Sequence, residues 1–248
     1  MVKTAIILAA GYAKRLYPLT KNFPKPLLEI EKNKPVINYI IEKLEKTDIE
    51  KIYLITNNKY FNHFINWKNN LKTNLNIEII NDNTKTEETR LGAIGDLNFT
   101  INKLNLAEPL LILSADNLYD FELTPIMNYF KEKEKDTTIL IEQPEEIIKL
   151  TSSVKIDNNS KITLFEEKPK IPKSLLVSIG IYLYTKETVN LIQHYLDSGN
   201  NPDQPGRFLQ WLYKEKEVHG LTINERWFDI GSLESLEKAR KEYKQKPL

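Results

Sequence analysis

Two cations near the amino terminus follow a short apolar run at a spacing suited to phosphate binding. The run Ala5 to Ala9 has the composition of a buried parallel strand. Gly11 comes next, where a missing side chain lets a ligand approach the backbone. Arg15 follows, and Lys25 stands between two prolines, which restrict the backbone on both sides and can aim its side chain. The small loop and the two cations therefore predict a polyphosphate site.

An aspartate ends a second apolar run in the middle of the chain. Asp116 comes just after Leu110 to Leu113, which reads as a buried strand. A carboxylate at the carboxyl edge of a sheet suits Mg²⁺, which uses one or two carboxylates together with substrate phosphates. The alternative for an isolated aspartate is that it caps the following turn. We expect Asp116 to be a metal ligand.

Bulk composition excludes several classes of function. The sequence has 248 residues, 41% hydrophobic and 28% charged, which fits one large α/β domain. A net charge of +1 gives no global field that would favour nucleic acid or an anionic membrane. The absence of cysteine excludes disulfides and thiolate chemistry and is compatible with a cytoplasmic location. The three histidines are scattered and form no metal-ligand spacing.

Short apolar runs alternate with amphipathic segments through the first part of the chain. Strands are expected at the following residues: 5–9, 52–56, 77–80, 110–113 and 137–141. Helices are expected at 34–44, with Pro35 in the first turn, at 60–71 and from about residue 92. This alternation predicts an α/β fold with a doubly wound, mostly parallel sheet, which binds ligands at the carboxyl ends of its strands.

From about residue 150 the pattern changes to strands of alternating character. They are expected at 153–157, 161–167 and 176–184, with a turn at Asn158-Asn159 and a helix at 208–214. We therefore predict one domain over 1–248, with a nucleotide-binding part at about 1–145 and a smaller, β-rich sugar-phosphate-binding part at about 146–248.

Several motifs together resemble the sugar-1-phosphate nucleotidyltransferases, the family of glucose-1-phosphate thymidylyl- and uridylyltransferases. The matching stretches are Leu8 to Gly11, Arg15-Leu16, Pro18-Leu19-Thr20 and Pro24 to Leu27, then Glu166 to Pro169 and Trp227 to Gly231. The resemblance runs from Ile6 to about Ala239 and implies a bare catalytic domain of that Rossmann-like fold, without the hexapeptide-repeat β-helix of some relatives.

The resemblance implies a role for each matching residue. Catalytic roles fall to Arg15, Lys25, Asp116 and Asp229, and the last two are also the Mg²⁺ ligands. Nucleotide contacts fall to Leu8, Ala9, Ala10, Gly11 and Gly92, and Glu87 is placed at the base edge by its position before Gly92. Sugar-phosphate contacts fall to Glu167, Lys168, Gly180 and Arg207. For Gly92 the alternative is tight helix packing, and for Arg207 it is a solvated side chain.

Three departures from the family pattern have consequences. Ala13 replaces a second glycine, so a left-handed backbone is not expected there. Ser152-Ser153 stands where many relatives have Tyr-Gly, which leaves the identity of the sugar open. Asp96 replaces a small residue of the commoner pattern and marks a subgroup.

The implied activity joins a nucleoside triphosphate, dTTP or UTP, to a sugar 1-phosphate and releases pyrophosphate. A phosphate oxygen of the sugar 1-phosphate attacks the α-phosphorus in line, with Mg²⁺ as cofactor. Two alternatives stay open: a cytidylyltransferase acting on a phospho-alcohol, and an inactive nucleotide-binding regulatory subunit. A dinucleotide-binding oxidoreductase is disfavoured because residues 10–15 lack Gly-x-Gly-x-x-Gly. Neither nucleic acid nor membrane is expected as a partner, and a homo-oligomer is left open.

Overall fold

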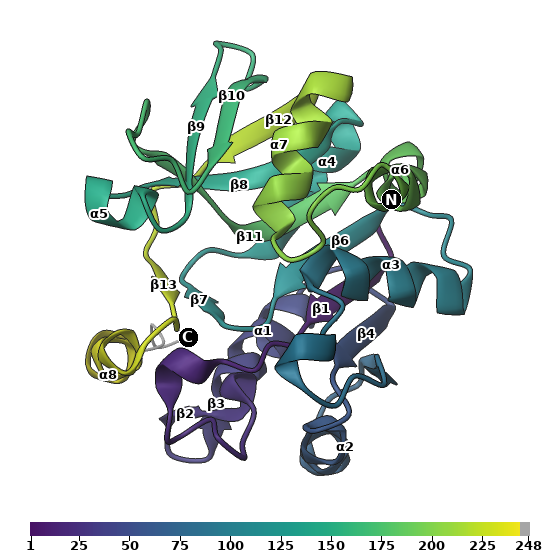
Figure 1. The fold of residues 1–248 in the computed structure, drawn as a ribbon, viewed down its shortest axis with the longest axis vertical. Coiled ribbons are helices and arrows are strands. Elements are labelled where there is room, and N and C mark those ends of the chain that lie inside the picture. The colour runs from purple at the N-terminus through teal and green to yellow at the C-terminus, as the bar shows by residue number, and fades with distance from the viewer. Residues whose placement is uncertain (244–248) are drawn as a thin grey trace.

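A mixed sheet, covered by helices on both faces, forms the centre of the molecule (Figure 1). The structure, a computed structural model, describes residues 1–243. In that part a nine-stranded sheet has the order β10-β9-β11-β6-β1-β4-β5, and β8 pairs with both β11 and β12. Two small sheets, β2 with β3 and β7 with β13, complete the strands of the described residues. No helix of residues 1–243 is long and apolar enough to cross a membrane.

The strands have the following bounds: β1 Thr4–Leu8, β2 Glu29–Glu31, β3 Lys34–Pro35, β4 Lys51–Thr56, β5 Asn76–Asn81, β6 Leu110–Ser114, β7 Asn117–Tyr119, β8 Asp136–Glu142, β9 Ser152–Ile156, β10 Ile162–Glu167, β11 Leu176–Tyr184, β12 Val218–Thr222 and β13 Trp227–Asp229. The α-helices are α1 Val36–Leu44, α2 Phe61–Asn70, α3 Ala93–Leu104, α4 Leu123–Lys133, α5 Glu145–Ile148, α6 Lys186–Asp197, α7 Pro205–Glu215 and α8 Leu233–Glu242. Short 3₁₀ helices are η1 Lys14–Leu16, η2 Lys25–Leu27 and η3 Glu87–Thr89.

The predicted doubly wound fold is confirmed by how the sheet pairs and packs. Strand β1 is parallel to both β4 and β6, and β4 is parallel to β5. Ala5 and Ile7 point into the core on the face covered by α1, α2 and α4, while Ile6 joins the core under α3, α6 and α7. Because alternate residues of β1 are buried on opposite faces, its sequence is apolar from Ala5 to Leu8, as a central parallel strand requires.

The carboxyl-terminal part extends the same sheet with antiparallel strands. β11 pairs antiparallel with β6 at one side and with β8 at the other, and β9 and β10 form an antiparallel pair beyond it. The expected turn at Asn158-Asn159 is confirmed between β9 and β10. Thus β11, through β6 and β8, and β12, through β8, join the two parts of the chain in one sheet.

Two local expectations about elements were wrong. Pro35 is the residue before α1 rather than a member of its first turn, because Lys34–Pro35 pairs with β2 instead. The matching stretch Trp227 to Gly231, for which the family resemblance implies a turn, begins instead with strand β13, whose partner β7 lies over a hundred residues earlier. The pairing could not be read from either short segment alone.

A buried pair of carboxyl groups joins the end of β5 to the first turns of α3. Asp82 and Asp96 are 5% and 6% exposed and share a side-chain hydrogen bond. Burial raises the pKa of Asp82, while bonds accepted from the Thr84 backbone N–H at 2.6 Å and from its hydroxyl at 3.0 Å act to lower it. Burial, with Asp82 next to it, raises the pKa of Asp96 to about 8. At neutral pH Asp96 therefore holds a proton that it donates to Asp82.

We expect Asp96→Asn to stabilise the protein at pH 8 but not near pH 4. Between pH 4 and 8 the folded state keeps the Asp96 proton, which the unfolded chain releases. The free energy of unfolding of the wild type therefore falls as pH rises, by at most about 1.4 kcal/mol per pH unit for one group. The side-chain amide of the variant donates the same hydrogen bond at every pH. Thermal unfolding from pH 4 to 8 measures the difference, with the exposed Asp48→Asn as control; parallel curves for wild type and Asp96→Asn would contradict the shared proton.

Candidate functional site

The loop after β1 offers an open backbone turn at the carboxyl edge of the sheet. Ala9 and Ala10 are buried, and their carbonyl oxygens accept from Thr56 Oγ1 at 3.4 Å and Asn57 Nδ2 at 2.8 Å. Gly11 lies at the exposed tip, and a Cβ built there would meet nothing within 4 Å. Of the nucleotide candidates Leu8 to Gly11, Gly11 borders open space at the sheet edge. Their contact with a nucleotide stays a prediction.

Ala13 adopts the left-handed conformation that its sequence did not predict. Its φ is 49° and its ψ 43°. The carbonyl oxygen of Ala13 accepts from Thr20 Oγ1 at 2.7 Å and from the Leu16 N–H at 3.0 Å. These two bonds hold the strained residue, so an alanine can occupy a position where glycine would be the easier choice. The turn starts η1, which carries Lys14 and Arg15.

Lys25 lies inside the site and pairs with Asp116. It opens η2, which follows Pro24 in the extended conformation, and the Leu28 N–H donates to the Lys25 carbonyl at 3.0 Å. Its ammonium forms an ion pair with Oδ2 of Asp116, and the two side chains are only 14% and 27% exposed. The Pro-Lys-Pro motif thus fixes a short turn that directs a half-buried cation at the end of β6.

Asp229 is brought beside Asp116 by the pairing of β7 with β13. In that pair Asp229 is opposite Asn117, and the Ile230 N–H donates to the Asp116 carbonyl at 3.0 Å. Burial and the charge of Asp116 raise the pKa of Asp229, against the lowering effect of Lys25 and Arg15. The two predicted metal ligands therefore lie close enough to repel one another.

Arg15 lies beside Asp229, so that Arg15, Lys25, Asp116 and Asp229 form one group, called the charged corner below. A Cβ built on Gly231 would lie 2.8 Å from Oδ2 of Asp229 and 3.6 Å from Nη2 of Arg15. Gly231 therefore leaves the space in which the carboxylate and the guanidinium meet. The structure brings together all four residues for which sequence predicted catalytic roles, two anions and two cations.

The charged corner suits a divalent ion that takes two carboxylates from the protein and its other ligands from phosphate oxygens and water. Within residues 1–243 no three His, Asp or Glu side chains gather closely enough to hold a metal by themselves. The pair Asp116 and Asp229 offers carboxylate oxygens, and the Lys25 ammonium already stands as a cation against one of them. Mg²⁺ uses one or two carboxylates and fills its remaining positions with phosphate oxygens and water. This donor set suits Mg²⁺ better than a metal that needs three or four protein ligands.

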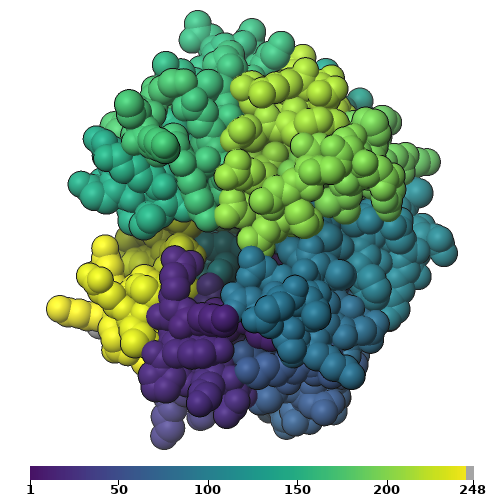
Figure 2. All heavy atoms as spheres, in the orientation of Figure 1, coloured from purple at the N-terminus to yellow at the C-terminus, as the bar shows by residue number. Residues whose placement is uncertain are grey.

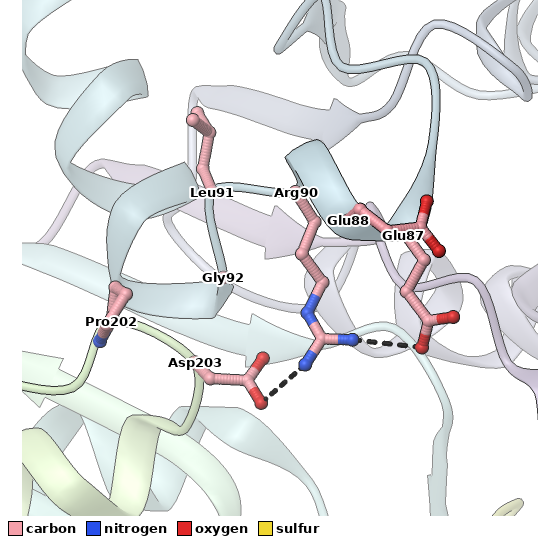
Figure 3. A pocket seen from close by; sticks show the side chains of 7 residues that line it. All are labelled: Glu87, Glu88, Arg90, Leu91, Gly92, Pro202 and Asp203. Carbon is pink, nitrogen blue, oxygen red and sulfur yellow. Dashed lines mark hydrogen bonds and ion pairs between the residues drawn. The ribbon is translucent and has the colours of Figure 1, made fainter.

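The predicted base-edge residue, Glu87, lies in a network of ion pairs (Figure 3). It pairs with Lys14 of η1 and, at 3.0 Å, with Nη1 of Arg90, whose Nη2 reaches Oδ2 of Asp203 at 2.9 Å. Glu87, Arg90 and Asp203 line a cavity of about 410 Å³ that also includes Gly92. Arg90 thereby connects η3 to the loop before α7, so the cavity has walls from both parts of the chain.

Gly92 has a packing role that its sequence context left open. Its φ is +81°, and a Cβ there would lie 2.6 Å from the Pro202 carbonyl oxygen. The Ala93 and Ile94 N–H groups donate to the carbonyls of Asp203 and Pro202, at 3.3 and 2.8 Å. The first turn of α3 is therefore already bonded to protein, and close packing alone requires glycine at position 92. A contact of Gly92 with the base stays a prediction.

Glu167, the predicted sugar ligand, is held against the start of α7. Its N–H donates to Oε1 of Gln210 at 2.8 Å, and a Cβ on Gly206 would lie only 1.9 Å from Oε2 of Glu167. Burial raises the pKa of Glu167 to about 7, although Lys168 and Arg207 act to lower it. Lys168 and Arg207 are themselves exposed, and Lys168 has a left-handed backbone, φ 50°. The structure thus gathers Glu167, Lys168 and Arg207 at one place; sequence reasoning missed Gly206, which makes room for the carboxylate.

Gly180, the fourth predicted sugar-phosphate residue, packs against Ser114 and Asn117, the residues on either side of Ala115-Asp116. It has φ 76° in an irregular stretch of β11, where a Cβ would lie 2.6 Å from Ser114 Oγ and 3.1 Å from Asn117 Nδ2. Asn117 was also missed: its Oδ1 accepts from Trp227 Nε1 at 2.8 Å, and its Nδ2 lies 3.4 Å from Oδ1 of Asp116. The signal available in the sequence was its position directly after Asp116.

The two serines that replace Tyr-Gly have structural partners. Ser152 Oγ accepts from the Ser178 N–H at 2.9 Å. Ser153 Oγ accepts from the Lys173 and Ser174 N–H groups, both at 3.0 Å. Both serines are fully buried, so they bind β11 and the loop before it rather than facing a ligand.

The space-filling view shows where these groups open to solvent. In Figure 2 the surface is hollowed where the purple amino-terminal segment, the teal segment and the green and yellow carboxyl-terminal segments meet. This is the region between the loop after β1 and the strands β7, β11 and β13 of Figure 1.

Comparison with known proteins gives one consistent result. A family model described as nucleotidyl transferase matches residues 4–246. The bifunctional protein GlmU of Methanococcus aeolicus is 31% identical over 92% of the chain, which covers 51% of that protein. Mannose-1-phosphate guanylyltransferase 1 of Arabidopsis thaliana is 30% identical over 92% of the chain, which covers 61% of it. A UDP-glucose pyrophosphorylase, solved with UDP-glucose, superposes with a TM-score of 0.82 at 21% identity, covering 97% of this chain and 98% of that one, which supports the fold.

Proposed function

This chain belongs to the nucleotidyl transferase family, and we propose that it joins a nucleoside triphosphate to a sugar 1-phosphate, giving a nucleotide-sugar and pyrophosphate. The single observation that carries the proposal is the gathering of Arg15, Lys25, Asp116 and Asp229 at one corner of the sheet. Two cations and two carboxylates match the needs of phosphoryl transfer, which depends on positioning and charge neutralisation.

The reaction needs no covalent enzyme intermediate. A phosphate oxygen of the sugar 1-phosphate is already anionic, so it attacks the α-phosphorus directly and the α–β bridging oxygen leaves with pyrophosphate. Arg15 neutralises charge on the triphosphate, and Lys25 holds one of its phosphates. Lys168 binds the phosphate of the sugar substrate, and Glu167 accepts from a sugar hydroxyl. When bound by Asp116 and Asp229, Mg²⁺ supplies Lewis-acid stabilisation of the phosphate oxygens.

For the nucleotide we propose dTTP or UTP, on the resemblance to thymidylyl- and uridylyltransferases. The Arabidopsis relative is named a guanylyltransferase, so the relatives do not agree on one base, and the choice of dTTP or UTP rests on the resemblance alone. Pyrophosphate release, measured for dTTP, UTP, CTP, ATP and GTP crossed with several sugar 1-phosphates and with phosphocholine, tests both substrates. Turnover with phosphocholine and CTP alone would instead identify a phospho-alcohol cytidylyltransferase. Nucleotide binding with no pyrophosphate release would identify a regulatory subunit.

Asp116→Asn and Asp229→Asn should each abolish most activity. Each substitution keeps the shape and removes one negative charge from the metal pair, and the double variant should lose little beyond the worse single one because the pair acts as a unit. EDTA should stop the wild type and Mg²⁺ restore it, as followed by pyrophosphate release. The exposed Asp48→Asn is the control. Full activity in excess EDTA would rule out this metal role.

Arg15→Ala should lower turnover far more than it weakens nucleotide binding. Loss of one preorganised charge donor costs about 10²–10³ in rate. Steady-state kcat, with nucleotide affinity measured separately by calorimetry, gives the comparison. Arg240→Ala, which removes an arginine of α8 that pairs with Glu237, is a matched control and should keep its turnover. Wild-type kcat in purified, folded Arg15→Ala would show that Arg15 does not act on the phosphates.

Gly206→Ala should raise the KM for the sugar 1-phosphate without changing the KM for the nucleotide. The new methyl group would overlap Oε2 of Glu167 and push the carboxylate out of its position. Loss of a hydrogen bond to a charged group predicts a rise of about 10- to 100-fold. In a Glu167→Gln background, where the charge is already gone, Gly206→Ala should add much less. Equal effects in both backgrounds would mean that Gly206 acts on α7 and not through Glu167.

A further inference from the structure

The Lys25 ammonium stands against Asp116, one of the two predicted metal ligands. Its ammonium pairs with Oδ2 of Asp116, while Oδ1 of the same carboxylate lies 3.4 Å from the amide nitrogen of Asn117. Both oxygens of Asp116 therefore already face a donor. A metal ion that approaches Asp116 therefore competes with the charge of the lysine.

The lysine is held in that position by its backbone. The Leu27 N–H donates to the Pro24 carbonyl and the Leu28 N–H to the Lys25 carbonyl, both at 3.0 Å, which closes the short turn of η2. Since proline on each side restricts the main chain, only the side chain of Lys25 can move away. The lysine can thus exchange one anionic partner for another without refolding of the loop.

The charges of the corner balance before any ligand arrives. Asp116 and Asp229 carry two negative charges, and Lys25 and Arg15 carry two positive charges. In the described part of the chain no third acidic or histidine side chain joins the two carboxylates. A divalent ion alone would therefore add an uncompensated double charge to a half-buried site, which is unfavourable.

We propose that the Lys25 ammonium is a resident counter-ion of the metal site, which excludes free divalent ions until a polyphosphate arrives and takes Lys25 as its own partner. The proposal rests on the proposed function for the identity of the site. In this scheme the triphosphate brings the negative charge that the metal requires and removes the lysine from Asp116 in the same event. Metal and nucleotide then enter together, and neither carboxylate is left without a cation.

Binding of Mn²⁺ alone tests the inference without turnover. Free Mn²⁺ is measured by electron paramagnetic resonance in mixtures with wild type, Lys25→Met and Lys34→Met, with no nucleotide present. Lys34, paired with Glu42 on β3 and α1, is the matched control for loss of a lysine from an ion pair. We expect Lys25→Met to bind Mn²⁺ about tenfold or more tightly than wild type, because one competing charge is gone. Lys34→Met should match the wild type.

Two further variants make the outcome decisive. Adding Asp116→Asn to Lys25→Met should remove the gain in affinity, which assigns it to this site. If Lys25→Met fails to fold, Lys25→Gln keeps a donor to Asp116 but no charge, and Mn²⁺ should raise its melting temperature more than that of wild type. Equal Mn²⁺ affinity in wild type and a folded Lys25 variant would overturn the counter-ion. Equal affinities would say nothing against the proposed function, because the wild type would still release pyrophosphate with Mg²⁺. Conversely, if the wild type releases no pyrophosphate with any substrate pair, the proposed function is wrong, whatever the Mn²⁺ affinities are.

Discussion

Asp116 and Asp229 are two like charges that the fold forces together. The pairing of β7 with β13 and the bond from the Ile230 N–H to the Asp116 carbonyl hold their backbones side by side. Burial makes the repulsion stronger, since less water screens it. Lys25 and Arg15 offset it, and both come from the loops that follow β1. The first loop region and β13, the last strand of residues 1–243, are thus coupled through charge, although most of the sequence lies between them.

The sugar-side residues are coupled to that corner through β11. This strand pairs with β6, which ends just before Asp116, and its irregular stretch places Gly180 against Ser114 and Asn117. At the other side of the site, Arg90 joins η3 to Asp203 before α7, and α7 in turn holds Glu167. Both parts of the chain therefore meet around one hollow, as Figure 2 shows. A shift of α7 would move the walls of the cavity and the Glu167 carboxylate together.

The sequence predicted those features whose cause is local. Apolar runs specify buried strands, so β1, β4, β5 and β6 were found within about one residue of their ends. In the charged corner, Arg15, Lys25 and Asp116 stand in short motifs that follow such strands, whereas Asp229 was assigned by the family resemblance. Other features depend on partners far along the chain. Strand β13 exists only beside β7, Gly206 is explained only by Glu167, and the protonation of Asp96 depends on Asp82. At Ala13 the bond from Thr20 outweighs the conformational preference of the residue itself.

The hydrogen bond from Trp227 to Asn117 gives the protein an optical label of its own. The indole N–H of Trp227 donates to the Asn117 side chain, and the amide of Asn117 faces Asp116. The other two tryptophans lie on α2 and α7. Indole emission responds to charge and to hydrogen bonding at its nitrogen. Any exchange of cations at Asp116 therefore changes the surroundings of the Trp227 indole through one side chain, that of Asn117. The fluorescence of one native residue thus reports on the charge state of the corner without any added dye.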